Sequence, residues 1–86
     1  MRLTIYSKPG CHLCDQMKSL VHRVLAGQPS DHMAVVDEVD ISSDRALLDR
    51  YGLEIPVLLI DGKKVAKYRV SEEELRRMMD ARREEG

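Results

Sequence analysis

The chain has 86 residues, of which 43% are hydrophobic and 34% are charged, and its formal net charge is −1. A chain of this length is expected to form one domain, residues 1–86, whose small core excludes a second domain or a large enclosed cofactor. The near-neutral charge argues against a nucleic-acid partner, because nucleic-acid surfaces normally carry an excess of Lys and Arg. No segment approaches the roughly 18 apolar residues of a membrane span, so no membrane partner is expected.

The N-terminal part predicts a strand, a turn and a helix. Leu3 to Ser7 has the composition of a strand, which we expect to be central, and Lys8-Pro9-Gly10 is typical of a turn. A helix is predicted to begin at Cys11 and to end at Gly27 and Pro29. Its apolar residues recur at helical spacing and are Leu13, Met17, Leu20, Val21, Val24 and Leu25.

The middle of the chain predicts a second strand, a short helix and a buried strand. Met33 to Val39 is rich in Val and forms the second strand. Ser42 or Ser43 is expected to cap the short helix, with Gly52 just past its end. Ile55 to Ile60 is almost continuously apolar, which indicates a strand buried on both faces.

The last part predicts a hairpin and a helix. Asp61-Gly62 is a hairpin turn signal, and Lys64 to Val70 is expected to form an edge strand with Ala66, Tyr68 and Val70 on one face. Ser71 and Glu74 have capping-box spacing at the start of the final helix. The buried residues of that helix are expected to be Leu75, Met78 and Met79. The order β-α-β-α-β-β-α indicates an α/β fold with a four-stranded mixed sheet flanked by three helices.

The segment Cys11-His12-Leu13-Cys14 places two thiols three positions apart at the predicted helix start. A thiolate is the form of cysteine that attacks a disulfide, and the free N–H groups of a helix start favour negative charge. Lys8 and His12 add positive charge nearby, so the pKa of Cys11 is expected to lie below that of a free thiol. Residues three apart share one side of a helix, which lets the sulfurs form a disulfide. Cys11 is therefore the expected attacking thiol, and Cys14 the thiol that resolves the mixed disulfide.

The start of the chain, Met1 to Tyr6, leads directly into a strand without a leader-like segment, and we therefore expect a cytoplasmic, reducing location. Two cysteines at this spacing there indicate catalysis or metal binding. A structural zinc site usually has four Cys or His ligands, which come in pairs at short sequence spacing. The three histidines of this chain do not form such a pair, so no metal is expected. An iron–sulfur cluster across a dimer and a pair of inert, packed cysteines are the remaining alternatives.

The segment Tyr6 to Cys14 resembles the active-site segment of glutaredoxins and of small glutaredoxin-like redoxins. In those proteins a strand is followed by Tyr, Thr or Ser, Lys, two further residues and Cys-x-x-Cys. Ile55 to Val57 resembles their Val-Pro element, and the order of elements matches from Leu3 to about Arg82. The resemblance implies a thioredoxin-like fold of the glutaredoxin-like type and an enzyme that carries out thiol–disulfide exchange.

The resemblance also assigns roles to individual residues. It makes Cys11 the nucleophile and Cys14 the resolving cysteine. Pro56 becomes a cis-proline that faces the cysteines, and the backbone of Ile55 the group that pairs with an extended thiol substrate. Lys8 becomes the contact for a substrate carboxylate.

The chain departs from glutaredoxins in the stretch after the last strand and in His12-Leu13, which replaces the Pro-Tyr common in glutaredoxins, so their redox potential is not carried over. It also differs from thioredoxins at one position. Ile5 occupies the position of the buried acid of thioredoxins, which favours the glutaredoxin-like branch. Glutaredoxins grip glutathione with Gly-Gly and an acidic residue after the last strand, whereas this chain has Lys67 to Glu72, with Arg69 as a substitute cation. Losing hydrogen bonds to charged groups weakens binding strongly, so we expect weak dependence on glutathione.

The expected substrate is a small thiol or a protein disulfide. No tightly bound cofactor is expected; the reductant is either glutathione or a protein reductase, and the chain is expected to be a monomer. The alternative is a non-catalytic thioredoxin-like module that docks a partner, a metal or a cluster.

Overall fold

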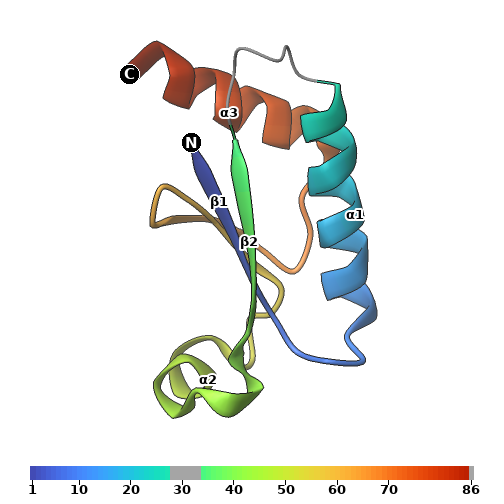
Figure 1. The fold of residues 1–86 in the computed structure, drawn as a ribbon, viewed down its shortest axis with the longest axis vertical. Helices are drawn as coiled ribbons and strands as arrows, with labels where there is room; N and C mark the ends of the chain where they lie inside the picture. Colours follow the sequence, from blue (N-terminus) through green and yellow to red (C-terminus); the bar gives the residue numbers. More distant parts are fainter. Residues whose placement is uncertain (28–33, 86) are drawn as a thin grey trace.

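The computed structural model describes residues 1–27 and 34–85, with side chains through Arg82. Four strands and three α-helices follow one another in the predicted order (Figure 1). They are β1 (Arg2–Ser7), α1 (His12–Ala26), β2 (Val35–Asp40), α2 (Arg45–Tyr51), β3 (Val57–Ile60), β4 (Lys63–Lys67) and α3 (Glu72–Glu85). No helix in the described part of the chain is long and apolar enough to cross a membrane.

The strands form one mixed sheet in the order β2-β1-β3-β4. The pair β1–β2 is parallel, because α1 crosses over between them, and β1–β3 and β3–β4 are antiparallel. The predictions that β1 is central and that the strand after Gly62 is at an edge are therefore confirmed.

Strand β3 is buried on both faces, as its apolar sequence predicts. Leu58 and Ile60 pack with α1 and α3 in the larger core cluster, together with Leu3 from β1. Val57 and Leu59 face the opposite side. The alternation follows from the two-residue period of a strand, and it lets one short strand join two cores.

Helices α1 and α3 share one face of the sheet, and α2 covers part of the other (Figure 1). The buried residues of the first core are Leu3, Ile5, Met17, Leu20, Val21, Val24, Leu58, Ile60, Leu75 and Met79. The predicted apolar faces of the first and last helices supply most of its helical part, with Met78 packed partly buried at its margin. The second core contains Ile41, Tyr51, Val57 and Leu59.

The predicted cap of the short helix was wrong. The side chain of Asp44 accepts a hydrogen bond from the Leu47 N–H at 3.1 Å and caps α2. Ser42 and Ser43 instead lie in a 3₁₀ turn, where Asp40 accepts hydrogen bonds from both the N–H and the hydroxyl of Ser42. Asp is as favourable as Ser at a helix N-cap, and Ser42 is already hydrogen-bonded to Asp40.

Strand boundaries also differ from the prediction, and β1 and β4 each begin one residue earlier than expected. Strand β3 begins at Val57, after Pro56, and β2 extends to Asp40. The predictions for Pro29 and Met33 lie outside the described residues.

The predicted hairpin turn is confirmed, but the strand after it is shorter than predicted. Asp61 and Gly62 have φ of 51° and 84°, as the favoured two-residue hairpin turn requires. Strand β4 ends at Lys67, because Tyr68 has φ of 66° and turns the chain out of the sheet. The prediction that Tyr68 and Val70 continue one strand face was therefore wrong.

The capping box of α3 is present as predicted. The Ser71 N–H donates to Glu74 Oε1 at 3.1 Å, and the Glu74 N–H donates to the Ser71 hydroxyl at 3.0 Å. The backbone hydrogen bond from Ser71 holds the pKa of Glu74 below its ordinary value. The cap fixes where the segment between β4 and α3 ends, and this segment borders the candidate site.

Candidate active site

Strand β1 delivers the chain to the N-terminus of α1 through a three-residue turn. Gly10 has φ of 78°, a conformation that glycine adopts without the strain of a side chain. Cys11 is the N-cap of the helix, and its carbonyl accepts the first helical hydrogen bond from the Asp15 N–H at 3.1 Å. The sequence placed the helix start correctly, with Cys11 as its cap rather than its first residue.

Cys11 and Cys14 form a disulfide with their Cα atoms 5.2 Å apart. The two cysteines differ in exposure: Cys11 is half-buried and Cys14 is fully buried. The Cys14 N–H donates to Cys11 Sγ at 3.1 Å, so a free N–H group of the helix start points at this sulfur. An accessible sulfur next to such a donor, paired with an inaccessible one, suits successive steps of disulfide exchange.

The bond between Ile55 and Pro56 is cis, as the resemblance implies. Tyr6 of β1 pairs with Val57, so Pro56 lies at the end of the sheet from which β1 leads to Cys11. The Pro56 carbonyl accepts a hydrogen bond from the Tyr68 N–H at 2.8 Å. Among the described residues, no backbone hydrogen bond involves Ile55, which leaves its N–H and carbonyl available to an extended ligand.

Lys8 and His12 flank the disulfide in sequence. Lys8 is half-buried in the turn, and His12 is exposed on the first turn of α1. Within the described part of the chain, neither residue has an ion-pair partner. Lys8 is therefore free to interact with a ligand anion.

The centre of the sheet contains no acid at the position that thioredoxins use. Ile5 fills it and is fully buried. Ser7 is the one buried polar residue in the described ranges, so no buried carboxylate there can exchange a proton with Cys14. The same ranges contain no group of three or more His, Cys, Asp or Glu side chains placed to hold a metal ion.

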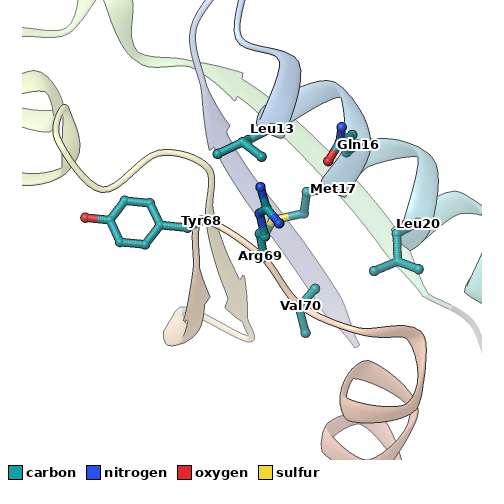
Figure 2. Close-up of a pocket in the computed structure, with 7 residues that line it drawn as sticks. All are labelled: Leu13, Gln16, Met17, Leu20, Tyr68, Arg69 and Val70. Carbon is teal, nitrogen blue, oxygen red and sulfur yellow. The ribbon is translucent and has the colours of Figure 1, made fainter.

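A pocket of about 120 Å³ lies between α1 and the segment that follows β4 (Figure 2). The residues that line it are Leu13, Gln16, Met17, Leu20, Tyr68, Arg69 and Val70. Leu13 lies between the two cysteines in sequence, so the pocket starts next to the disulfide. The sequence did not predict this pocket, because its two walls are about fifty residues apart along the chain.

The family of glutaredoxin-like domains (DUF836) matches residues 2–80 of the chain. The protein belongs to this glutaredoxin-like family. A glutaredoxin-like protein of Dictyostelium discoideum, named as a YDR286C homolog, is 25% identical over 77 residues, which cover 87% of this chain and 71% of that protein. The family therefore agrees with the resemblance of the Cys-x-x-Cys segment.

Solved structures agree with this assignment. The X-ray structure of protein XcR50 from X. campestris is 34% identical, has a TM-score of 0.74, and is matched over 92% of this chain and 96% of its own. A mutant thioredoxin from Halobacterium salinarum is 26% identical with a TM-score of 0.61, over 93% of this chain and 72% of that one. The glutaredoxin-like protein thus has the thioredoxin fold with a Cys-x-x-Cys pair at disulfide distance.

Proposed function

We propose that this glutaredoxin-like protein is a thiol–disulfide oxidoreductase that cycles Cys11 and Cys14 between dithiol and disulfide. The observation that carries the proposal is the asymmetric pair at the start of α1, with Cys11 accessible and Cys14 buried. The segment Ile55-Pro56 lies at the end of the sheet from which β1 leads to this pair, and no backbone hydrogen bond of the described residues involves Ile55. Together these features provide an attacking sulfur, a resolving sulfur and a place to hold a substrate.

The reaction proceeds in two exchange steps. The Cys11 thiolate attacks one sulfur of the substrate disulfide, which forms a mixed disulfide and releases the first substrate thiolate. The Cys14 thiol loses its proton and attacks Cys11 Sγ, which closes the Cys11–Cys14 disulfide and releases the second substrate thiolate. Two electrons pass from the protein to the substrate, and both released thiolates take up protons from solvent or from Cys14. An external thiol reductant returns the protein to the dithiol state.

Three residues of the site are assigned to substrate binding in this proposal. The Ile55 N–H and carbonyl pair with the backbone of an extended substrate, Pro56 positions that segment, and Lys8 contacts a substrate carboxylate. The substrate is a small thiol or a protein disulfide, and a protein reductase or glutathione returns the electrons. The protein acts as a cytoplasmic monomer without a tightly bound cofactor.

We expect the pKa of Cys11 in the reduced protein to lie below the value of about 8.5 for a free thiol. The causes are the Cys14 N–H directed at Cys11 Sγ and the positive end of the α1 dipole. The charge of Lys8 adds to them, and so does the cation of His12 as the pH falls. Thiolate absorbance followed against pH in the Cys14→Ser variant reports Cys11 alone. The same variant unfolded in denaturant is the control and should titrate near the ordinary value. If the folded variant titrates with a midpoint at or above that of the unfolded control, the expected effect of the helix terminus on the pKa of Cys11 is contradicted.

The proposed function is tested by the reduction of a protein disulfide with each electron donor supplied in turn. The wild-type protein, at a catalytic concentration, should accelerate the reduction with at least one of the donors. The Cys11→Ser variant should match the rate of the donor alone. Absence of acceleration with every donor, in a protein shown to be folded and reduced, would overturn the proposal.

A further inference from the structure

The pocket beside the disulfide has one apolar wall and one charged residue at its rim. Leu13, Met17 and Leu20 supply apolar surface from α1, and Val70 supplies it from the opposite side. Arg69 is the only charged residue in the lining. In Figure 2 its guanidinium is directed toward the α1 side chains, whereas the Tyr68 ring points away from them.

A tight turn at Tyr68 produces this arrangement. The Arg69 N–H donates to the Lys67 carbonyl at 2.7 Å across Tyr68, whose φ is 66°, which defines a γ-turn of the positive-φ type. Such turns are rare and strained, and a bulky residue with positive φ is an outlier that the surroundings must hold in place. Two hydrogen bonds do so: the Tyr68 N–H donates to Pro56 and its hydroxyl donates to the Leu53 carbonyl at 3.1 Å. The turn separates adjacent side chains, with Tyr68 toward the cis-proline loop and Arg69 over the pocket.

Arg69 has no anionic partner in the described part of the chain. Most other exposed arginines there do have carboxylate partners, namely Arg2, Arg23, Arg45, Arg76 and Arg77. Arg50 instead lies over the ring of Tyr51, 5.2 Å from its centroid. The pocket lining contains no acid either. An unpaired guanidinium at the edge of an apolar pocket complements a ligand that places a carboxylate next to an apolar side chain.

We propose that this pocket binds the disulfide-bearing segment of a protein substrate in which an apolar side chain is next to Asp or Glu. The apolar side chain packs on Leu13 and Met17, and the carboxylate pairs with Arg69. This docking brings the substrate cysteine to Cys11, next to the free backbone groups of Ile55. The proposal rests on the proposed thiol–disulfide exchange and names the class of substrate that the same site selects.

The test uses synthetic peptide disulfides in two sets, which differ in where a dipeptide is placed relative to the cysteine. Within each set the peptides differ only in the residue that follows Leu. Each peptide contains a cysteine with Leu-Glu, Leu-Gln or Leu-Lys placed either before or after it. The kcat/KM for reduction is measured with the wild type, with Arg69→Glu, and with Lys63→Glu as a control of equal charge change. Lys63 is exposed near the hairpin turn of β4, away from the pocket, and should leave the rates unchanged.

For the better placement, the wild type should prefer the Leu-Glu peptide over the Leu-Lys peptide by about five- to tenfold, as expected for a charge-assisted but accessible pair. Arg69→Glu should remove or reverse this order, and Lys63→Glu should keep it. Equal wild-type rates on all peptides would overturn the docking proposal while leaving the exchange function intact. Absence of reduction of every peptide and of a protein disulfide would instead refute the exchange function. If the wild type reduces all peptides with the same kcat/KM, and Arg69→Glu no longer reduces glutathione disulfide, the proposal is overturned. Glutathione would then be the ligand of this pocket.

Discussion

Replacing Cys11 with Ser should reduce catalysed disulfide reduction to the uncatalysed rate, whereas Cys14→Ser should trap the protein as a mixed disulfide with its substrate. A serine hydroxyl is not ionised at neutral pH and cannot replace the attacking thiolate. In Cys14→Ser the accessible Cys11 still attacks, but no buried thiol remains to release the product. Intact-protein mass spectrometry should show the added mass of the substrate thiol on Cys14→Ser and none on Cys11→Ser.

The two variants serve as controls for each other, because each removes one sulfur from the same disulfide. Their folding should be compared first, since Cys14 is in the core and Cys11 is only half-buried. If Cys11→Ser forms the mixed disulfide quickly and Cys14→Ser does not react, the roles of the two cysteines are reversed. That result would also contradict the exposure argument on which the assignment depends.

Turnover with glutathione and glutathione reductase should be at least about a hundredfold below that with an efficient protein donor, because two or more charged hydrogen bonds are missing at about 1.5–3 kcal/mol each. The stretch after β4 lacks the Gly-Gly and acidic residue with which glutaredoxins grip glutathione. The nearest acid, Glu72, is already paired with Arg23 at 3.3 Å and with Arg76 at 3.4 Å. The Ser71 N–H is likewise occupied by Glu74.

Steady-state kinetics with glutathione as the only donor measure this dependence, and Arg69→Ala is the informative variant. Arg69 is the remaining cation that could hold a glutathione carboxylate at this end of the site. Rapid glutathione turnover that is lost in Arg69→Ala would show that Arg69 replaces the missing glycine turn, and would refute the prediction. Lys63→Ala provides the matched control, since it removes an exposed cation near the hairpin.

The elements of the fold could be predicted from apolar spacing because burial determines them. The stripe on α1 and the continuous apolar run of β3 both correspond to buried surfaces in the two cores. The position of Cys11 at a helix start followed from the turn before it and the stripe after it. The cis bond before Pro56 could be predicted only from the resemblance, because a lone X-Pro sequence favours trans.

The features that the sequence missed depend on contacts between distant parts of the chain. Tyr68 gives no local signal for a positive φ, since glycine or asparagine normally marks such a turn. Its conformation depends on hydrogen bonds to Pro56 and Leu53, which both belong to the loop between α2 and β3. The pocket that Arg69 lines depends on this turn, so the sequence could not predict the pocket either.

The most direct test of the central claim is a redox titration of the wild-type protein in buffers of defined potential, with thiol alkylation counted by mass. We expect Cys11 and Cys14 to lose or gain alkylation together in one two-electron transition. Its midpoint should lie between about −120 and about −270 mV, the range of known dithiol oxidoreductases. The Cys11→Ser variant should show no such transition. Cysteines that stay reduced across this range, or a disulfide that persists below about −300 mV as structural disulfides do, would contradict the account and favour a binding module.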